Sequence, residues 1–149
     1  MTKATDLLTA YDNLDWDVYI ALSEDLTHIN EVQIDDELSK QATLFSYYSG
    51  LYEYAKRDSE ITEVELTKCQ AEARIKGQAE CEAAGTRPTV AVLDSFVNTD
   101  EFCAKITLSL IETKYKLGLL KSLMQSLSHK KDCLIQLSAN QRDEKKIYS

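Results

Sequence analysis

A heptad pattern in the last fifty residues constrains the fold more than any other feature of the chain. Hydrophobic residues fall seven apart on two neighbouring rows of a helix. The first row is Leu110, Leu117 and Met124, and the second is Leu120, Leu127 and Leu134. Stripes of this kind are stable only when they pack against other helices. The sequence therefore predicts one long helix from about Glu101, with these residues as the oligomer interface.

A second long helix is predicted from residue 35 to about residue 83. Apolar residues recur early in it at intervals of three and four. They are Leu38, Ala42, Phe45, Tyr48, Tyr52 and Ala55. Asp35 or Asp36 is expected to cap its first turn. We expect Gly50 and Gly77 where a neighbouring element comes close to the helix backbone.

The two long helices are separated by an elbow at about residues 84–100. Gly85 suits the position after a helix end, and Pro88 prevents the helix from continuing. A short helix or an extended crossing follows, and Asp100 is expected to cap the last helix. The predicted fold class is therefore all-α, with residues 35–149 forming a long antiparallel helical hairpin.

Residues 1–34 are predicted to form a separate acidic segment of one or two short helices, or a loosely packed arm. Residues 1–37 contain one lysine and ten acidic residues, whereas residues 101–149 contain nine basic and five acidic residues. The net charge of the chain is −8. This distribution indicates either two electrostatically different surfaces or helices with ordinary charged solvent faces.

The sequence has no catalytic or cofactor-binding signature, so we expect no enzyme activity and no cofactor. It contains no GxxxxGK[ST], GxGxxG or HExxH motif. Its cysteines are Cys69, Cys81, Cys103 and Cys133. They show no CxxC spacing, which argues against a metal site. We expect buried free thiols in a cytoplasmic protein, and no membrane span.

Basic residues provide the clearest indication of a ligand. The candidate nucleic-acid contacts are Lys68, Arg74, Lys76, Lys121, Lys130 and Lys131. Several copies of such a patch can follow a phosphate backbone without reading its sequence. The alternative is an ordinary lysine-rich solvent face, and the acidic total charge argues against a dedicated monomeric binder.

A group of tyrosines in the first long helix leaves two interpretations open. These residues are Tyr47, Tyr48, Tyr52 and Tyr54. Their rings can stack on the bases of a single strand. They can also fill a helical interface, with the hydroxyl groups reaching water at its rim, and we favour this packing role.

From about Gln41 to Lys146, the chain resembles the UvsY-type recombination mediator proteins of tailed phages. The segments that carry the resemblance are Glu72–Lys76, Gly85–Thr89 with Val92-Leu93, and Leu127–Leu137. The resemblance implies a ring-like homo-oligomer that binds single-stranded DNA. It also implies a protein that helps load a RecA-like recombinase in place of single-strand-binding protein, in the host cytoplasm if phage-encoded. Arg74 and Lys76 match the DNA-contacting run of the family, but the acidity of this chain departs from it.

Two other functions stay open at this point. One is a helical adaptor, structural or chaperone-like protein that oligomerises without binding DNA. The other is a small inhibitor whose acidic head, residues 1–34, imitates nucleic acid. The mediator is our first prediction because it accounts for both the basic residues and the predicted self-association.

Overall fold

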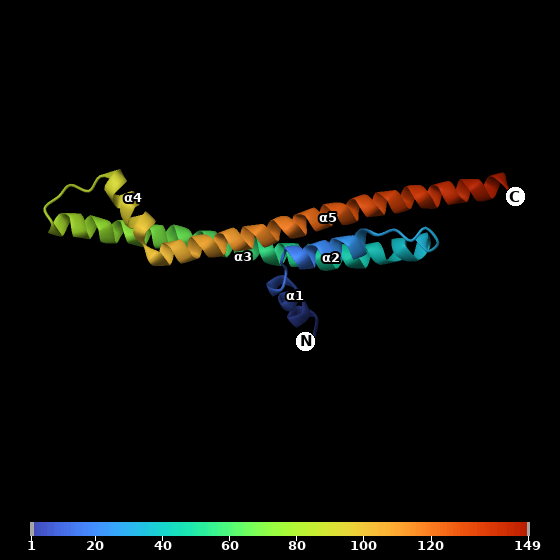
Figure 1. Cartoon of the computed structure of the whole chain (residues 1–149), viewed down its shortest axis with the longest axis horizontal. Helices are drawn as coiled ribbons and strands as arrows, with labels where there is room; N and C mark the ends of the chain where they lie inside the picture. The colour runs from blue at the N-terminus through green and yellow to red at the C-terminus, as the bar shows by residue number, and fades with distance from the viewer. Residues whose placement is uncertain (1, 149) are drawn as a thin grey trace. The chain divides into compact units, whose positions relative to one another are not determined.

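The computed structural model describes residues 2–148, with side chains described from residue 6 onward. Over this part of the chain there are five helices and no strand, which confirms the all-α class (Figure 1). The helices are α1 (Thr2–Asp12), α2 (Trp16–Thr27), α3 (Ile34–Ala83), α4 (Val90–Thr99) and α5 (Glu101–Ile147). None of these described helices combines the length and apolar composition needed to cross a bilayer.

Local capping chemistry sets the ends of the helices around the elbow. Gly85 has a φ of 69°, and the backbone N–H of Thr86 donates to the Cys81 carbonyl at 2.9 Å, which closes the end of α3. The Thr89 hydroxyl accepts from the Val92 N–H at 3.3 Å and caps α4. Asp100 caps α5, as predicted. The segment after Pro88 is therefore a helix and not an extended crossing.

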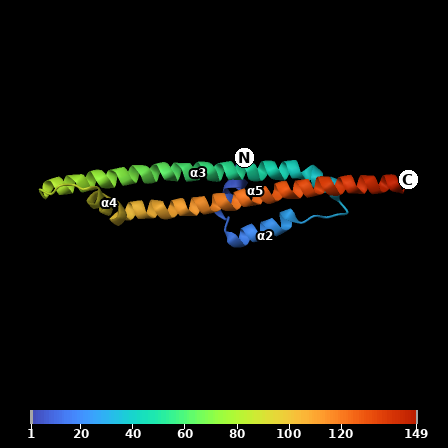
Figure 2. The same cartoon turned by 90° about the horizontal axis from the view of Figure 1, so that it is seen from above.

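The helices contribute to two compact units. Unit 1 contains the residues up to Ala55 and from Lys116 onward, and unit 2 contains residues 56–115. Within each unit, the segments of α3 and α5 run side by side in opposite directions (Figures 1 and 2). Of residues 1–34, which we predicted as a separate segment, the described residues 2–34 belong to unit 1.

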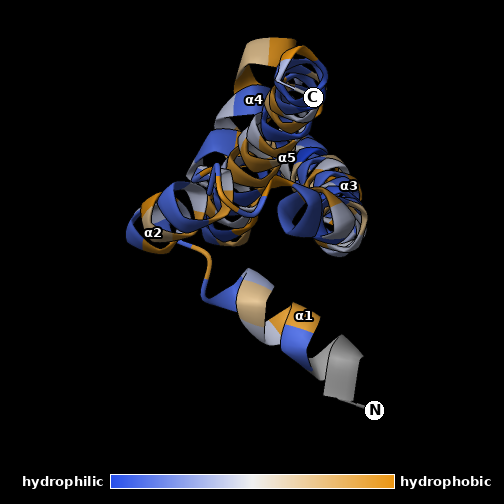
Figure 3. Ribbon diagram, turned by 90° about the vertical axis from the view of Figure 1, so that its right-hand side faces the viewer, coloured by the Kyte–Doolittle hydropathy of each residue, from blue (hydrophilic) through white to orange (hydrophobic). Residues whose placement is uncertain are grey.

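Unit 1 has a core to which α1, α3 and α5 all contribute. Its buried members are Tyr11, Leu14, Tyr48, Leu51, Ala55, Leu119, Leu120, Leu123 and Leu127. Side chains of α2, such as Leu22 and Leu26, pack against this core. Figure 3 shows hydrophobic and hydrophilic residues interspersed along α2, several of whose apolar side chains are partly buried.

The predicted interface residues of α5 are instead largely buried within the chain itself. Leu120, Leu127 and Leu134 are no more than 1% exposed. Leu117 and Met124 are partly buried against the same core. The assignment as an oligomer interface was therefore wrong for Leu120, Leu127 and Leu134, because a heptad pattern shows that a face packs on helices but not which chain supplies them. Leu110 is partly buried in unit 2.

Unit 2 is smaller and is cross-linked. Cys69 of α3 and Cys103 of α5 form a disulfide, with their Cα atoms 5.8 Å apart. The prediction of free buried thiols was wrong for this pair, because the antiparallel packing of the two helices brings residues 34 positions apart into contact. Cys81 is a buried free thiol as predicted, whereas Cys133 is free but exposed.

Candidate functional site

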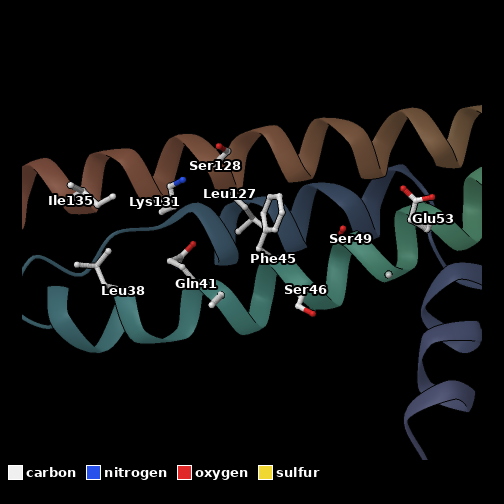
Figure 4. Close-up of a pocket in the computed structure, with 12 residues that line it drawn as sticks. Leu38, Gln41, Phe45, Ser46, Ser49, Glu53, Leu127, Ser128, Lys131 and Ile135 are labelled. Carbon is white, nitrogen blue, oxygen red and sulfur yellow. The ribbon is translucent and has the colours of Figure 1, made fainter.

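A groove opens between α3 and α5 within unit 1 (Figure 4). Its volume is about 710 Å³, which lies in the range of small-molecule sites in proteins. The α3 lining residues are Leu38, Gln41, Ala42, Phe45, Ser46, Ser49, Gly50 and Glu53, and the α5 residues are Leu127, Ser128, Lys131 and Ile135. The groove therefore has an apolar floor with a few polar groups and one cation.

Phe45 and Lys131 are the two lining residues with the most distinctive chemistry. Phe45 projects from α3 towards α5, beside Leu127 (Figure 4), and is 43% exposed. The Lys131 side chain is 52% exposed, with its Nζ 3.6 Å from Asp132 Oδ1. A solvent-exposed ion pair of this length holds the ammonium only weakly. The groove thus presents an aromatic face and an available positive charge together.

The polar lining groups can form hydrogen bonds but do not form a catalytic set. Ser49 and Ser128 place hydroxyl groups on the groove from opposite helices. Gln41 is buried, and its Nε2 donates to the Glu37 carbonyl at 3.4 Å. The lining residues include no histidine, cysteine or aspartate. A nucleophile paired with a histidine base is therefore not available in this groove.

A second hollow in unit 1 lies next to the groove. It has a volume of about 610 Å³ and shares Ala42 and Ser46 with the groove. Tyr47 lines it and is 38% exposed. The α3 ridge at Ala42 and Ser46 therefore separates two hollows, with Phe45 on one side and Tyr47 on the other.

The other tyrosines of the predicted group pack within unit 1. Tyr48 is buried, and this burial is the main reason that the pKa of its hydroxyl is raised. The nearby Tyr47 and Asp25 raise this pKa further. Tyr52 packs against the core. Tyr54 contacts Tyr11 edge to face, with ring centroids 5.1 Å apart. Packing accounts for Tyr48 and Tyr52. Tyr54 and Tyr47 each contact another tyrosine ring edge to face and stay 39% and 38% exposed, so both remain accessible to a ligand.

Lys130 does not face solvent, contrary to its predicted role as a phosphate contact. Its side chain is 6% exposed, and its Nζ lies 2.7 Å from Glu37 Oε2. The same Nζ donates to the Leu26 carbonyl at 2.9 Å. The hydrogen bond from Lys130 is the main cause of a lowered pKa for Glu37, although burial opposes it. Lys130 therefore ties α5 to α2 and α3 within unit 1.

The other predicted basic residues fall in both units. Lys121 and Lys131 are exposed on unit 1, whereas Lys68, Arg74 and Lys76 are exposed on unit 2. Arg74 forms an ion pair with Asp94, with Nη2 and Oδ1 3.0 Å apart. Lys68 and Lys76 each line a hollow that also contains two or more acidic residues. Nearby carboxylates thus offset the basic run of unit 2.

Phe45 is the site residue that the sequence did not single out. Its position in the spacing of three and four predicted an apolar face of α3. That signal does not separate a residue packed in the core from one left open beside it. The useful additional signal was the small size of Ala42, Ser46 and Ser49 around Phe45, because small side chains leave room for a ligand beside an aromatic ring.

We also compared the chain with known proteins. No family model matches it, and no curated protein or solved structure was found to be similar.

Proposed function

We propose that this protein binds single-stranded DNA as an oligomer and acts as a recombination mediator. In this role it would help load a RecA-like recombinase in place of single-strand-binding protein. The observation that carries the proposal is that Phe45 and Lys131 both line one groove. An aromatic ring beside a cation is the combination that binds a base and its phosphate without sequence preference. The resemblance to UvsY-type mediators supports the biological role.

The groove accounts for how a strand would be held. A base stacks on the ring of Phe45, and the ammonium of Lys131 contacts a phosphate. Hydroxyl groups of Ser49 and Ser128 accept or donate hydrogen bonds at the base edges. A second base has Tyr47 available across the α3 ridge. Because every base has a flat face, binding of this kind depends little on sequence.

A single copy of the groove would bind weakly, since the chain is acidic overall. The net charge of −8 repels a polyanion, and Glu53 lies in the groove itself. Several linked copies raise the effective concentration of each site and convert weak contacts into stable binding. Self-association, in a ring or another closed form, is therefore part of the proposed mechanism.

A row of exposed apolar residues on unit 2 supports self-association. Leu108, Ile111 and Tyr115 recur at intervals of three and four on α5, so they share one helix face. They are 67%, 60% and 42% exposed. A contiguous apolar patch of this kind is typical of a surface that another protein covers. We propose this row as the contact between copies, in place of the heptad residues.

The test is binding of a fluorescent oligothymidylate to the full chain at low salt, followed by anisotropy. Phe45→Ala should weaken binding by about 1–3 kcal/mol, the usual value of one stacked base. Lys131→Ala should also lower the slope of log affinity against log salt by about 1. Phe102→Ala and Lys105→Ala are matched controls, because both residues are exposed and lie outside the groove.

Two results would contradict the proposal. One is no detectable binding by the wild type at low salt. The other is an equal loss of affinity in Phe45→Ala and Phe102→Ala, which would mean that the groove is not the binding site. Circular dichroism of each variant shows whether the helices are intact.

A helical adaptor that assembles without DNA is the second candidate, and the charges of the groove favour it. Glu53 lies at one end of the groove, away from Lys131 (Figure 4). If two grooves met around a two-fold axis, Lys131 of one copy would face Glu53 of the other. Under this alternative, a chain that carries both Lys131→Glu and Glu53→Lys would still assemble, and oligothymidylate would not bind.

A further inference from the structure

Three potential metal ligands converge in unit 2, where α3 passes the start of α5. Cys69 and Cys103 form the disulfide, and Asp100 immediately precedes α5. Asp100 Oδ1 accepts from the backbone N–H of Cys103 at 2.8 Å and lies 3.9 Å from Cys69 Sγ. One donor atom from each of the three residues lies within 4.8 Å of the other two. The fold therefore gathers two sulfurs and a carboxylate at one point.

We propose that reduction of this disulfide creates a site in which Cys69, Cys103 and Asp100 bind a thiophilic divalent cation of the zinc type. Thiolate sulfur and carboxylate oxygen are both zinc ligands. In a tetrahedral site, bonds of about 2.0–2.3 Å place neighbouring donor atoms about 3.5–3.8 Å apart. Asp100 Oδ1 already lies 3.9 Å from Cys69 Sγ, and reduction lets the two sulfurs move apart from bonding distance to this spacing.

Surrounding groups give the ion an approach and a fourth ligand. A hollow of about 280 Å³ reaches Cys69 and is also lined by Glu65 and Glu72. A second hollow, of about 250 Å³, reaches Asp100. Water that enters through these hollows can occupy the fourth position of a tetrahedral ion. The start of α5 also favours negative charge, which suits a thiolate at Cys103.

The disulfide and the metal site exclude each other. A dithiol reductant supplies two electrons and two protons, so the Cys69–Cys103 bond breaks, two thiols form, and the reductant becomes a disulfide. Binding of the cation then releases the two thiol protons to solvent. In either state α3 and α5 stay cross-linked in unit 2, first by a covalent bond and then by the ion.

The experiment is a titration of the reduced full chain with Co²⁺, which reports thiolate ligands through a charge-transfer absorption band. A background with Cys81→Ala and Cys133→Ser removes the two free thiols. A phosphine is used as reductant so that no small thiol competes for the metal. We expect one Co²⁺ per chain, displacement of Co²⁺ by Zn²⁺, and no band from the oxidised protein.

Asp100→Asn is the critical variant, because asparagine keeps the helix cap but is a poor metal ligand. It should weaken Co²⁺ binding by roughly tenfold or more, since loss of even an outer-sphere partner costs 10–100-fold. Glu101→Gln, one residue further along, is the matched control and should leave the affinity unchanged. Cys69→Ser should remove the band.

The proposal fails if the reduced background protein gives no charge-transfer band. It also fails if Asp100→Asn binds Co²⁺ as tightly as Glu101→Gln does, because a two-thiol site would then suffice. Circular dichroism of the reduced protein and of Asp100→Asn shows whether the helices are intact. Because Asp100→Asn keeps both cysteines, weaker binding by a folded variant is then due to the lost carboxylate.

Discussion

At the scale of single residues, Lys130 and Lys131 show that residue type and position in the sequence do not by themselves predict the role of a side chain. They are adjacent and chemically identical, yet Lys130 is buried against Glu37 and Lys131 lies on the groove. Successive residues on a helix differ by about 100° in direction, so neighbours face different surroundings. The sequence predicted a helix here but could not indicate which lysine faces α3, because that depends on the rotation of α5 about its own axis.

The buried Lys130–Glu37 pair leads to a stability prediction. Lys130→Met keeps most of the unbranched apolar side chain but leaves the Glu37 carboxylate without its cation. Breaking a buried pair in this way costs about 3–5 kcal/mol. We expect a loss towards the lower figure, because the Glu37 side chain is still 19% exposed. Urea denaturation at neutral pH measures it, and Lys131→Met is the control, with an expected cost below about 1 kcal/mol.

The same pair makes the stability depend on pH. The pKa of Glu37 is lower in the folded protein than in the unfolded chain, chiefly because Lys130 hydrogen-bonds to it. The ionised carboxylate therefore stabilises the fold at and above the ordinary glutamate pKa, and this contribution is lost as the pH falls through the lowered value. The stability difference between wild type and Lys130→Met should shrink over that acidic range. A difference that is constant with pH would exclude this role for Glu37.

At the scale of elements, the helix ends around the elbow were predictable, whereas helix neighbours were not. The predicted cap of α3 was wrong, because α3 begins at Ile34 and Asp35 and Asp36 lie inside its first turn. The end of α3 near Gly85 and the start of α5 after Asp100 follow from local chemistry that lies within a few residues. The groove and the disulfide depend on which turn of α3 meets which turn of α5. That register is set by packing along both helices, and no local sequence signal specifies it.

Two helical glycines should respond in opposite directions to the same substitution. A Cβ atom at Gly77 would lie 2.6 Å from Cδ2 and 2.7 Å from Cγ of Phe96, whereas at Gly118 it would meet no atom within 4 Å. Alanine in place of glycine stabilises an open helix position by about 1 kcal/mol. We therefore expect Gly118→Ala to raise the melting temperature. Gly77→Ala should lower it, because Phe96 must move and unit 2 has few other buried contacts.

Gly50 provides a further comparison for this prediction. We expected close approach of a neighbour at both Gly50 and Gly77, and only Gly77 shows it. A Cβ atom at Gly50 would also meet nothing within 4 Å, but Gly50 lines the groove. Because a Cβ atom at Gly50 would have open space, Gly50→Ala should stabilise the protein as Gly118→Ala does. Destabilisation by Gly118→Ala would contradict the argument.

At the scale of the whole molecule, the heptad pattern correctly predicted a long helix but assigned its partner wrongly. Leu120, Leu127 and Leu134 pack inside unit 1. The surface that we propose for another copy is the row of Leu108, Ile111 and Tyr115, which is exposed on unit 2. A sequence pattern reports that a face is apolar, whereas the assignment to core or interface requires the tertiary fold.

We therefore expect different results from substitutions in the exposed row and in the buried heptad residues. Light scattering of the wild type should give several times 16.9 kDa. Ile111→Asp places a charge in the exposed row and should reduce the mass without loss of helicity, because its side chain is 60% exposed. Val64→Asp is the control, since Val64 is 70% exposed on α3 and outside the row.

Leu127→Ala should instead lower the free energy of unfolding by about 2–5 kcal/mol, because it leaves a cavity in the core of unit 1. A wild type that stays at 16.9 kDa at micromolar concentration, with and without a short single strand of DNA, would exclude both the contact between copies and the oligomeric binding that depends on it.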